Sequence, residues 1–159
     1  MNQVYLTLKM NKFTKTIQST LLCIRYPFLK YFYCKDKLIQ KSCWYFAVDK
    51  GWRYIALQMF REIRREMKRV KVPLSRFHIY DIKEKYGALD IDCNSFGDIS
   101  KIVEKYEYIS AHTCNICGRQ AYGYTDGYIL PYCADCGKDK NLIPYYTKDD
   151  KWYGYYKIQ

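Results

Sequence analysis

Four cysteines in the last third of the chain constrain its fold more than any other feature. They form two C-x-x-C pairs, each followed by glycine, within "HTCNICGRQAYGYTDGYILPYCADCGK": Cys114, Cys117, Cys133 and Cys136. Such spacing is typical of a zinc ribbon, in which two tight knuckles each supply two thiolates to one tetrahedral zinc ion. Gly118 and Gly137 suit the knuckles, because glycine adopts a positive φ at the least cost. We therefore predict a ribbon over residues 112–140 that binds one Zn²⁺.

Two alternatives concern the ligands of this site. The cysteines could form disulfides instead, although no secretory signal is recognisable, which favours reduced thiols. The remaining cysteines are scattered: Cys23, Cys34, Cys43 and Cys93. His112 could replace one cysteine as a ligand, or it could be a surface or helix-capping residue. Four cysteine ligands leave no position for water, which predicts a structural rather than a catalytic metal.

Ahead of the cysteines, the apolar pattern predicts a helix, a hairpin and a second helix. Apolar residues recur with helical spacing from Trp52 to Val70, and Pro73 stops this helix. "FHIYDI" and "ALDIDC" flank "KEKYG", which predicts a β-hairpin with Gly87 in its turn. Asp98 is the expected N-cap of the second helix. The apolar face of that helix comprises Ile99, Ile102, Val103, Tyr106 and Ile109.

The fold class predicted is α+β: a small domain of amphipathic helices and a β-hairpin, stapled by a C-terminal zinc ribbon with four cysteine ligands. Four parts follow along the chain: a basic N-terminal segment (1–42), a helix–hairpin–helix core (43–111), the ribbon (112–140) and a tyrosine-rich tail (141–159). Within the first 48 residues, "VYLTLKM" and "CWYFAV" predict short strands. Residues 15–34 predict a helix that is disturbed at Pro27.

The net charge of +11 is concentrated in the first half of the chain. Residues 1–76 carry 17 Lys and Arg against 4 Asp and Glu, whereas residues 77–159 carry 10 against 12. This asymmetry indicates an acidic partner, such as nucleic acid or a nucleoprotein. The early apolar run is too interrupted for a transmembrane helix. We expect no membrane partner and a cytoplasmic location.

The first predicted helix carries the most specific basic feature. Its cationic residues fall within one arc opposite the apolar face: Arg61, Arg64, Arg65 and Lys68. Like charges four residues apart destabilise an isolated helix by a few tenths of a kcal/mol, roughly, and an acidic ligand would offset this repulsion. The alternative is a solvated face in which Glu62 and Glu66 pair locally with the basic residues.

No catalytic set is recognisable in the sequence. The two histidines, His78 and His112, lack evident partners, and neither Cys43 nor Cys93 stands beside a recognisable base. No phosphate-binding glycine loop occurs. We therefore expect a non-enzymatic protein without a small-molecule substrate. The abundant tyrosines could stack on bases, pack in the core or form an interface.

Three blocks occur in a fixed order: "CWYFAVDKGWRYIALQMFREI", "IYDIKEKYGALDI" and "EKYEYISAHTCNICG…YCADCG". Together they resemble a family of small zinc-ribbon proteins of bacteriophages and prophages. That family has a Gly-Trp helix start, a Lys-Glu-Lys-Phe-Gly-Gly-Leu hairpin and a Thr-Cys-x-x-Cys-Gly ribbon. Tyr86, Ala88 and Asp90 depart from its Phe, second Gly and common Arg.

The resemblance implies a mobile-element origin, a zinc-stapled fold and a bacterial host cell, and it brings no enzymatic activity. Small phage proteins of this kind often act against host defences. The leading hypothesis is therefore an anti-defence inhibitor, for example an anti-CRISPR protein, that engages RNA, DNA or a host nucleoprotein through its basic half. The alternatives are a transcription or replication regulator that binds nucleic acid, and a structural or assembly protein.

Overall fold

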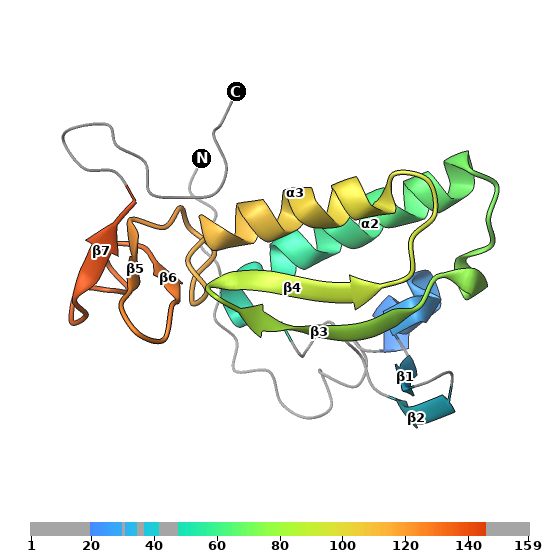
Figure 1. The fold of residues 1–159 in the computed structure, drawn as a ribbon, viewed down its shortest axis with the longest axis horizontal. Helices are drawn as coiled ribbons and strands as arrows, with labels where there is room; N and C mark the ends of the chain where they lie inside the picture. Colours follow the sequence, from blue (N-terminus) through green and yellow to red (C-terminus); the bar gives the residue numbers. More distant parts are fainter. Residues whose placement is uncertain (1–19, 30, 35–36, 42–47, 146–159) are drawn as a thin grey trace.

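The computed structural model describes residues 20–29, 31–34, 37–41 and 48–145 (Figure 1). Residues 20–25 are helical. The helices and strands that follow are β1 (Tyr31–Cys34), β2 (Lys37–Lys41), α2 (Arg53–Arg69), β3 (Ile79–Lys85), β4 (Ala88–Cys93), α3 (Ile99–Ala111), β5 (Gly123–Thr125), β6 (Pro131–Tyr132) and β7 (Leu142–Pro144). Three 3-10 turns complete the order: η1 (Pro27–Leu29), η3 (Lys50–Trp52) and η4 (Leu74–Arg76).

Helices α2 and α3 lie side by side against the antiparallel hairpin of β3 and β4 (Figure 1). A C-terminal antiparallel sheet of order β6-β5-β7 lies at one end of this core, and its strand β7 continues the ribbon beyond the predicted end at residue 140. The predicted α+β class is confirmed. None of the helices in the described segments is both long and apolar enough to cross a bilayer.

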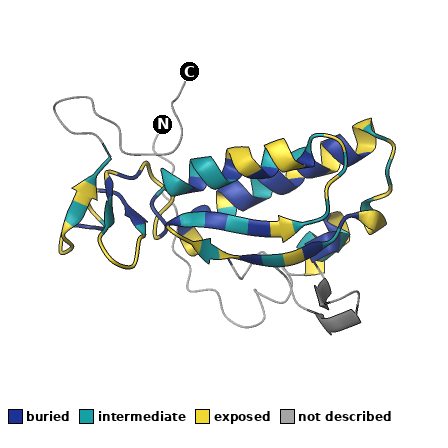
Figure 2. Cartoon of the chain, viewed as in Figure 1, coloured by how far each residue is buried: buried dark blue, intermediate teal, exposed yellow. Residues whose placement is uncertain are grey.

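Helix α2 supplies the centre of the core. Its apolar stripe is buried against the hairpin and α3, and its other side is exposed (Figure 2). The buried residues of the helix are Ile55, Ala56, Met59, Phe60, Ile63, Glu66 and Met67. The predicted span of Trp52 to Val70 is confirmed to within one residue at each end. The helix ends at Arg69, ahead of Pro73, and Lys71 turns the chain with a φ of 55°.

The predicted hairpin is confirmed, with Tyr86 and Gly87 as its two turn residues. Both have positive φ angles, 51° and 79°, as a two-residue turn between twisted strands requires. The register shifts between Ile79 and Asp81. This bulge changes which face each later residue occupies, so Ile82 joins Ile79 in the core, a change that simple alternation does not predict.

The N-terminal segment differs from the prediction. The helix ends at Arg25, a 3-10 turn follows at Pro27–Leu29, and residues 31–34 form strand β1, which pairs with β2. A helix through residue 34 was therefore wrong: Pro27 ends it, and the aromatic run YFYC after it favours an extended chain. The strand predicted at residues 4–10, and most of the one predicted at 43–48, lie outside the described residues.

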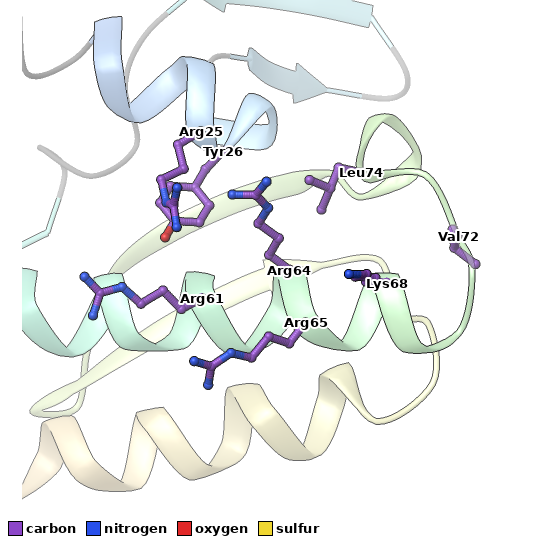
Figure 3. Close-up of a pocket in the computed structure, with 8 residues that line it drawn as sticks. All are labelled: Arg25, Tyr26, Arg61, Arg64, Arg65, Lys68, Val72 and Leu74. Atoms are coloured by element: carbon purple, nitrogen blue, oxygen red, sulfur yellow. The ribbon is translucent and has the colours of Figure 1, made fainter.

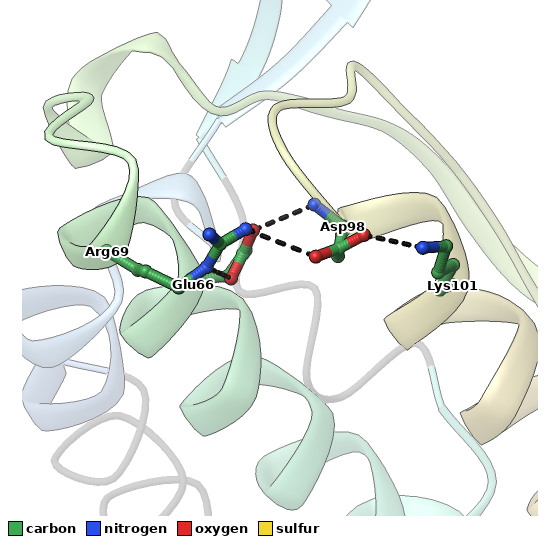
Figure 4. A network of polar contacts seen from close by, with 4 residues as sticks. All are labelled: Glu66, Arg69, Asp98 and Lys101. Carbon is green, nitrogen blue, oxygen red and sulfur yellow. Dashed lines mark hydrogen bonds and ion pairs between the residues drawn. The ribbon is translucent and has the colours of Figure 1, made fainter.

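Asp98 occupies the N-cap position of α3, but its side chain makes no capping hydrogen bond. Its carboxylate instead accepts from Arg69 at 3.1 Å and Lys101 at 2.8 Å (Figure 4). The backbone N–H of Asp98 donates to Glu66 Oε1 of α2 at 2.8 Å. Glu66 also accepts from Arg69 Nε and Nη2, at 2.7 and 2.6 Å. A carboxylate of α2 thus holds the start of α3.

This arrangement predicts an acid-sensitive contribution to stability. Hydrogen bonds from Arg69, then from the Asp98 amide, lower the pKa of Glu66 from 4.5 to about 2. Because the pKa is lower in the folded state, the stabilisation is present above pH 4.5 and is lost as the pH falls toward 2. The free energy of unfolding of the wild type, measured by urea denaturation, should therefore decrease over this pH range. In Glu66→Gln we expect this decrease to be smaller. The matched control is Glu104→Gln at an exposed position of α3; an equal change in both variants would contradict the prediction.

Candidate metal centre and cationic hollow

The two C-x-x-C-G motifs fold into equivalent turns. In each, the N–H of the glycine donates to the carbonyl of the first cysteine at 2.9 Å: Gly118 to Cys114, and Gly137 to Cys133. Gly118 has the predicted positive φ, 78°, whereas Gly137 is not among the residues with positive φ. The space at Gly137 is tight: an added Cβ would lie 2.4 Å from Leu142 Cδ1, which would have to shift, and 3.2 Å from the Cys133 carbonyl oxygen.

The two turns bring all four predicted cysteines together. The sulfurs of Cys114, Cys117, Cys133 and Cys136 lie within 4.8 Å of one another. Those of Cys117 and Cys133 are 3.6 Å apart, too far for a disulfide. Four Zn–S bonds of about 2.3 Å in a tetrahedron would place the sulfurs about 3.8 Å apart. The four free thiols therefore fit one metal ion.

The surroundings of the sulfurs favour a thiolate at one position. Burial opposes ionisation of Cys117, but hydrogen bonds from Arg119 and contacts with Cys133 and Cys114 lower the pKa of its thiol to about 6. Arg119 Nε lies 3.5 Å from the Cys117 sulfur, and Arg119 Nη1 lies 2.6 Å from Asp135 Oδ2. This arginine links the two turns, since Cys117 belongs to the first and Asp135 to the second.

The first cysteine turn is attached to the beginning of α2. The N–H of Gly51 donates to the Asn115 carbonyl at 2.7 Å, and Trp52 Nε1 donates to the Thr113 carbonyl at 2.8 Å. A Cβ on Gly51 would lie 2.2 Å from the Cys114 carbonyl oxygen. In the sequence, Gly51 and Trp52 indicate a turn and the start of a helix, and they form part of the family resemblance. The structure shows that glycine is required because the first cysteine turn approaches this backbone directly.

His112 is not part of the cysteine cluster. It is the C-cap residue of α3, its Nδ1 lies 2.9 Å from the Tyr108 carbonyl, and its ring packs against those of Tyr108 and Tyr145. Tyr145, from the tyrosine-rich tail, folds back on the body, where its hydroxyl donates to the Ala111 carbonyl. The aromatic residues that follow it in the tail lie outside the described residues: Tyr146, Trp152, Tyr153, Tyr155 and Tyr156.

The predicted basic residues of α2 line a second feature, a hollow of about 740 Å³ (Figure 3). Its lining residues are Arg25, Tyr26, Arg61, Arg64, Arg65, Lys68, Val72 and Leu74. Arg25 and Tyr26 come from the N-terminal segment and face α2 across the hollow, whereas Arg65 extends from the side of α2 that faces α3 (Figure 3). Sequence reasoning missed Arg25, whose distance of 36 residues from Arg61 gives no periodic signal.

The acidic residues of α2 make their hydrogen bonds away from this hollow, although the charge of Glu62 still acts on Arg65. Glu62 turns to α3, where it accepts from Lys105 Nζ at 2.8 Å and Tyr106 OH at 2.8 Å. Burial opposes ionisation of Glu62, but these two hydrogen bonds lower its pKa below the ordinary value. Glu66 is occupied by Arg69 and the start of α3. Among the residues that the structure describes, none of the five cations lining the hollow forms an ion pair.

The other residues considered for chemistry have structural contacts. Burial, then the charges of Asp92 and Glu107, raises the pKa of Cys93 to about 11, which does not suit a nucleophile. Glu84 of the KEKYG turn accepts from the Gly87 amide and from the hydroxyl of Tyr128 in the ribbon. His78 Nε2 lies 3.1 Å from the Ser75 carbonyl. Cys43 is outside the described residues.

Comparison of the chain with models of protein families, with curated proteins and with solved structures found no match.

Proposed function

We propose that this chain is a non-enzymatic binding protein that holds the phosphate backbone of nucleic acid, free or within a host nucleoprotein, in the cationic hollow. The observation that carries the proposal is the group of five cations around one concavity that has no acid among its lining residues. Arginine suits this role because its planar guanidinium binds phosphate oxygens in pairs. Four of the five cations are arginines.

The like charges on α2 support the same conclusion. Arg61 and Arg65 are four residues apart, as are Arg64 and Lys68, and each pair destabilises the helix by roughly 0.2–0.5 kcal/mol. Glu66 pairs with Arg69 and Glu62 accepts from Lys105; the charge of Glu62 acts on Arg65 without an ion pair, so this repulsion is compensated only in part. A bound polyanion would relieve it.

We propose zinc as the ion of the cysteine cluster. Cys114, Cys117, Cys133 and Cys136 would hold it, and four thiolates satisfy its tetrahedral preference. The ion would neutralise thiolates that otherwise repel one another and would fix the two turns of the ribbon. Its role is structural because the four cysteines complete its coordination.

The resemblance to phage proteins favours one form of this function, inhibition of a host defence complex such as a CRISPR nucleoprotein. An inhibitor of this kind acts stoichiometrically, so its effect saturates near equal amounts of protein and target. A transcription or replication regulator would instead bind free nucleic acid with a sequence preference. An assembly protein would show a mass that rises with concentration, with little effect of salt.

A charge-reversed α2 tests the proposed surface. We expect glutamate at Arg61, Arg64, Arg65 and Lys68 together to weaken binding of a labelled oligonucleotide by more than about a hundredfold. The buried stripe of α2 is untouched, so far-UV circular dichroism and the thermal midpoint should stay close to those of the wild type. The matched control is glutamate at Lys138 and Lys140, two exposed residues of the ribbon. If the charge-reversed variant binds the oligonucleotide as tightly as this control, the four basic residues of α2 are ordinary solvent-exposed residues without this function.

A further inference from the structure

We infer that the hollow accepts a single strand of nucleic acid in preference to a duplex, and that Arg25 is a phosphate ligand on the wall opposite α2. This inference rests on the proposed function and names its substrate class. Three properties of the hollow carry it: its two walls, its concave shape and its mixed lining.

The two walls are fixed relative to each other. Tyr26 and Phe28 of the N-terminal segment are buried, and their rings lie 6.1 and 5.7 Å from the ring of Phe60 on α2. The ring of Phe28 also lies 5.0 Å from that of Phe77, edge to face. Arg25 is exposed, directly before this anchored pair, with its guanidinium 5.9 Å from the centre of the Tyr26 ring. A buried aromatic contact therefore holds Arg25 facing Arg61 and Arg64.

The shape of the site disfavours a duplex. A helix reads duplex DNA when its convex surface enters the major groove, which is about 12 Å wide. Here the cationic side of α2 forms the floor of a hollow, and the segment bearing Arg25 rises beside it (Figure 3). A site of about 740 Å³ has the size of a small-ligand pocket, which suits a short stretch of flexible strand.

The chemistry of the lining points to the same ligand. Val72 and Leu74, both partly buried, extend the cationic lining with apolar surface. A duplex offers sugars, phosphates and the base edges in its grooves, but the faces of its bases are stacked inside. A single strand offers phosphates together with unstacked bases, whose faces pack on apolar and aromatic side chains. The combination of guanidinium groups and aliphatic surface matches this second set of groups.

The test compares one short labelled oligonucleotide, as a single strand and as a duplex, by fluorescence anisotropy. We expect the wild type to bind the single strand at least about tenfold more tightly than the duplex. Arg25→Glu should weaken single-strand binding by at least about tenfold, whereas Lys138→Glu in the ribbon should leave it nearly unchanged. Arg25→Gln is a milder second variant, expected to weaken binding less; it decides the question if the glutamate variant does not fold.

The outcomes separate this inference from the proposed function. If neither form of the oligonucleotide binds the wild type, the proposed function fails and this inference fails with it. If nucleic acid binds but the duplex is equal or better, the inference alone is overturned. The inference alone is also overturned if both Arg25 variants bind the single strand as tightly as Lys138→Glu does, while the charge-reversed α2 loses binding. Single-strand preference together with a specific loss at Arg25 supports it.

Discussion

Replacing Cys114 with serine should abolish metal binding and unfold the ribbon. Cys114 is fully buried, and its carbonyl lies against the beginning of α2, so the loss should extend into the helical core. Structural zinc sites contribute about 10 kcal/mol or more of apparent free energy, comparable with the whole stability of a small domain. We therefore expect a loss of at least about 5 kcal/mol in the free energy of unfolding.

Elemental analysis and denaturant unfolding check this expectation together. The wild type, purified under reducing conditions, should contain one zinc ion per chain, and a strong chelator should reproduce the effect of Cys114→Ser. Cys23→Ser is the control, since Cys23 lies outside the cluster and is only half-buried. The proposal would be contradicted if removing the metal left the free energy of unfolding of the wild type unchanged. Equal free energies of unfolding for the two serine variants would also contradict it.

Gly51→Ala should destabilise the protein strongly, because the alanine side chain has no room. The added methyl group would lie 2.2 Å from the Cys114 carbonyl oxygen and 2.6 Å from the Asn115 carbonyl carbon. Both neighbours are backbone atoms of the first cysteine turn, which cannot rotate away as a side chain could. Overpacking of this kind costs on the order of 3 kcal/mol.

Gly127→Ala provides the matched control. Gly127 has a φ of 74°, so alanine is strained there, but nothing lies within 4 Å of the added Cβ. Its cost should be about 1 kcal/mol, from the backbone alone. Urea denaturation of both variants isolates the packing contribution. Equal losses would show that the first cysteine turn does not contact the beginning of α2 as the structure has it.

Those elements that depend on local periodicity were predictable from the sequence. The spacing of apolar residues gave the span of α2, and a glycine between two alternating segments gave the hairpin. The paired C-x-x-C-G motifs gave the cysteine cluster residue by residue. In each case the signal lies within a few neighbouring residues, because the turn or helix face is itself a local structure.

Long-range contacts gave no such signal. Arg25 joins the hollow only because Tyr26 and Phe28 pack on Phe60, far along the chain. Glu66 does pair locally, with Arg69, but it also accepts from the backbone at the start of α3, which no spacing within α2 reveals. The bulge after Ile79 displaces the hairpin alternation by one residue, a shift that strict alternation does not reveal.

The most direct measurement of the central claim is the salt dependence of single-strand binding by the wild-type protein. Each phosphate neutralised by a cation contributes about −0.7 to the slope of log K against log salt concentration for single strands. With five cations lining the hollow, we predict a linear decrease with a slope of roughly −3.5. An affinity that does not change with salt, or no binding at low salt, would contradict the assignment of the hollow as a phosphate-binding site.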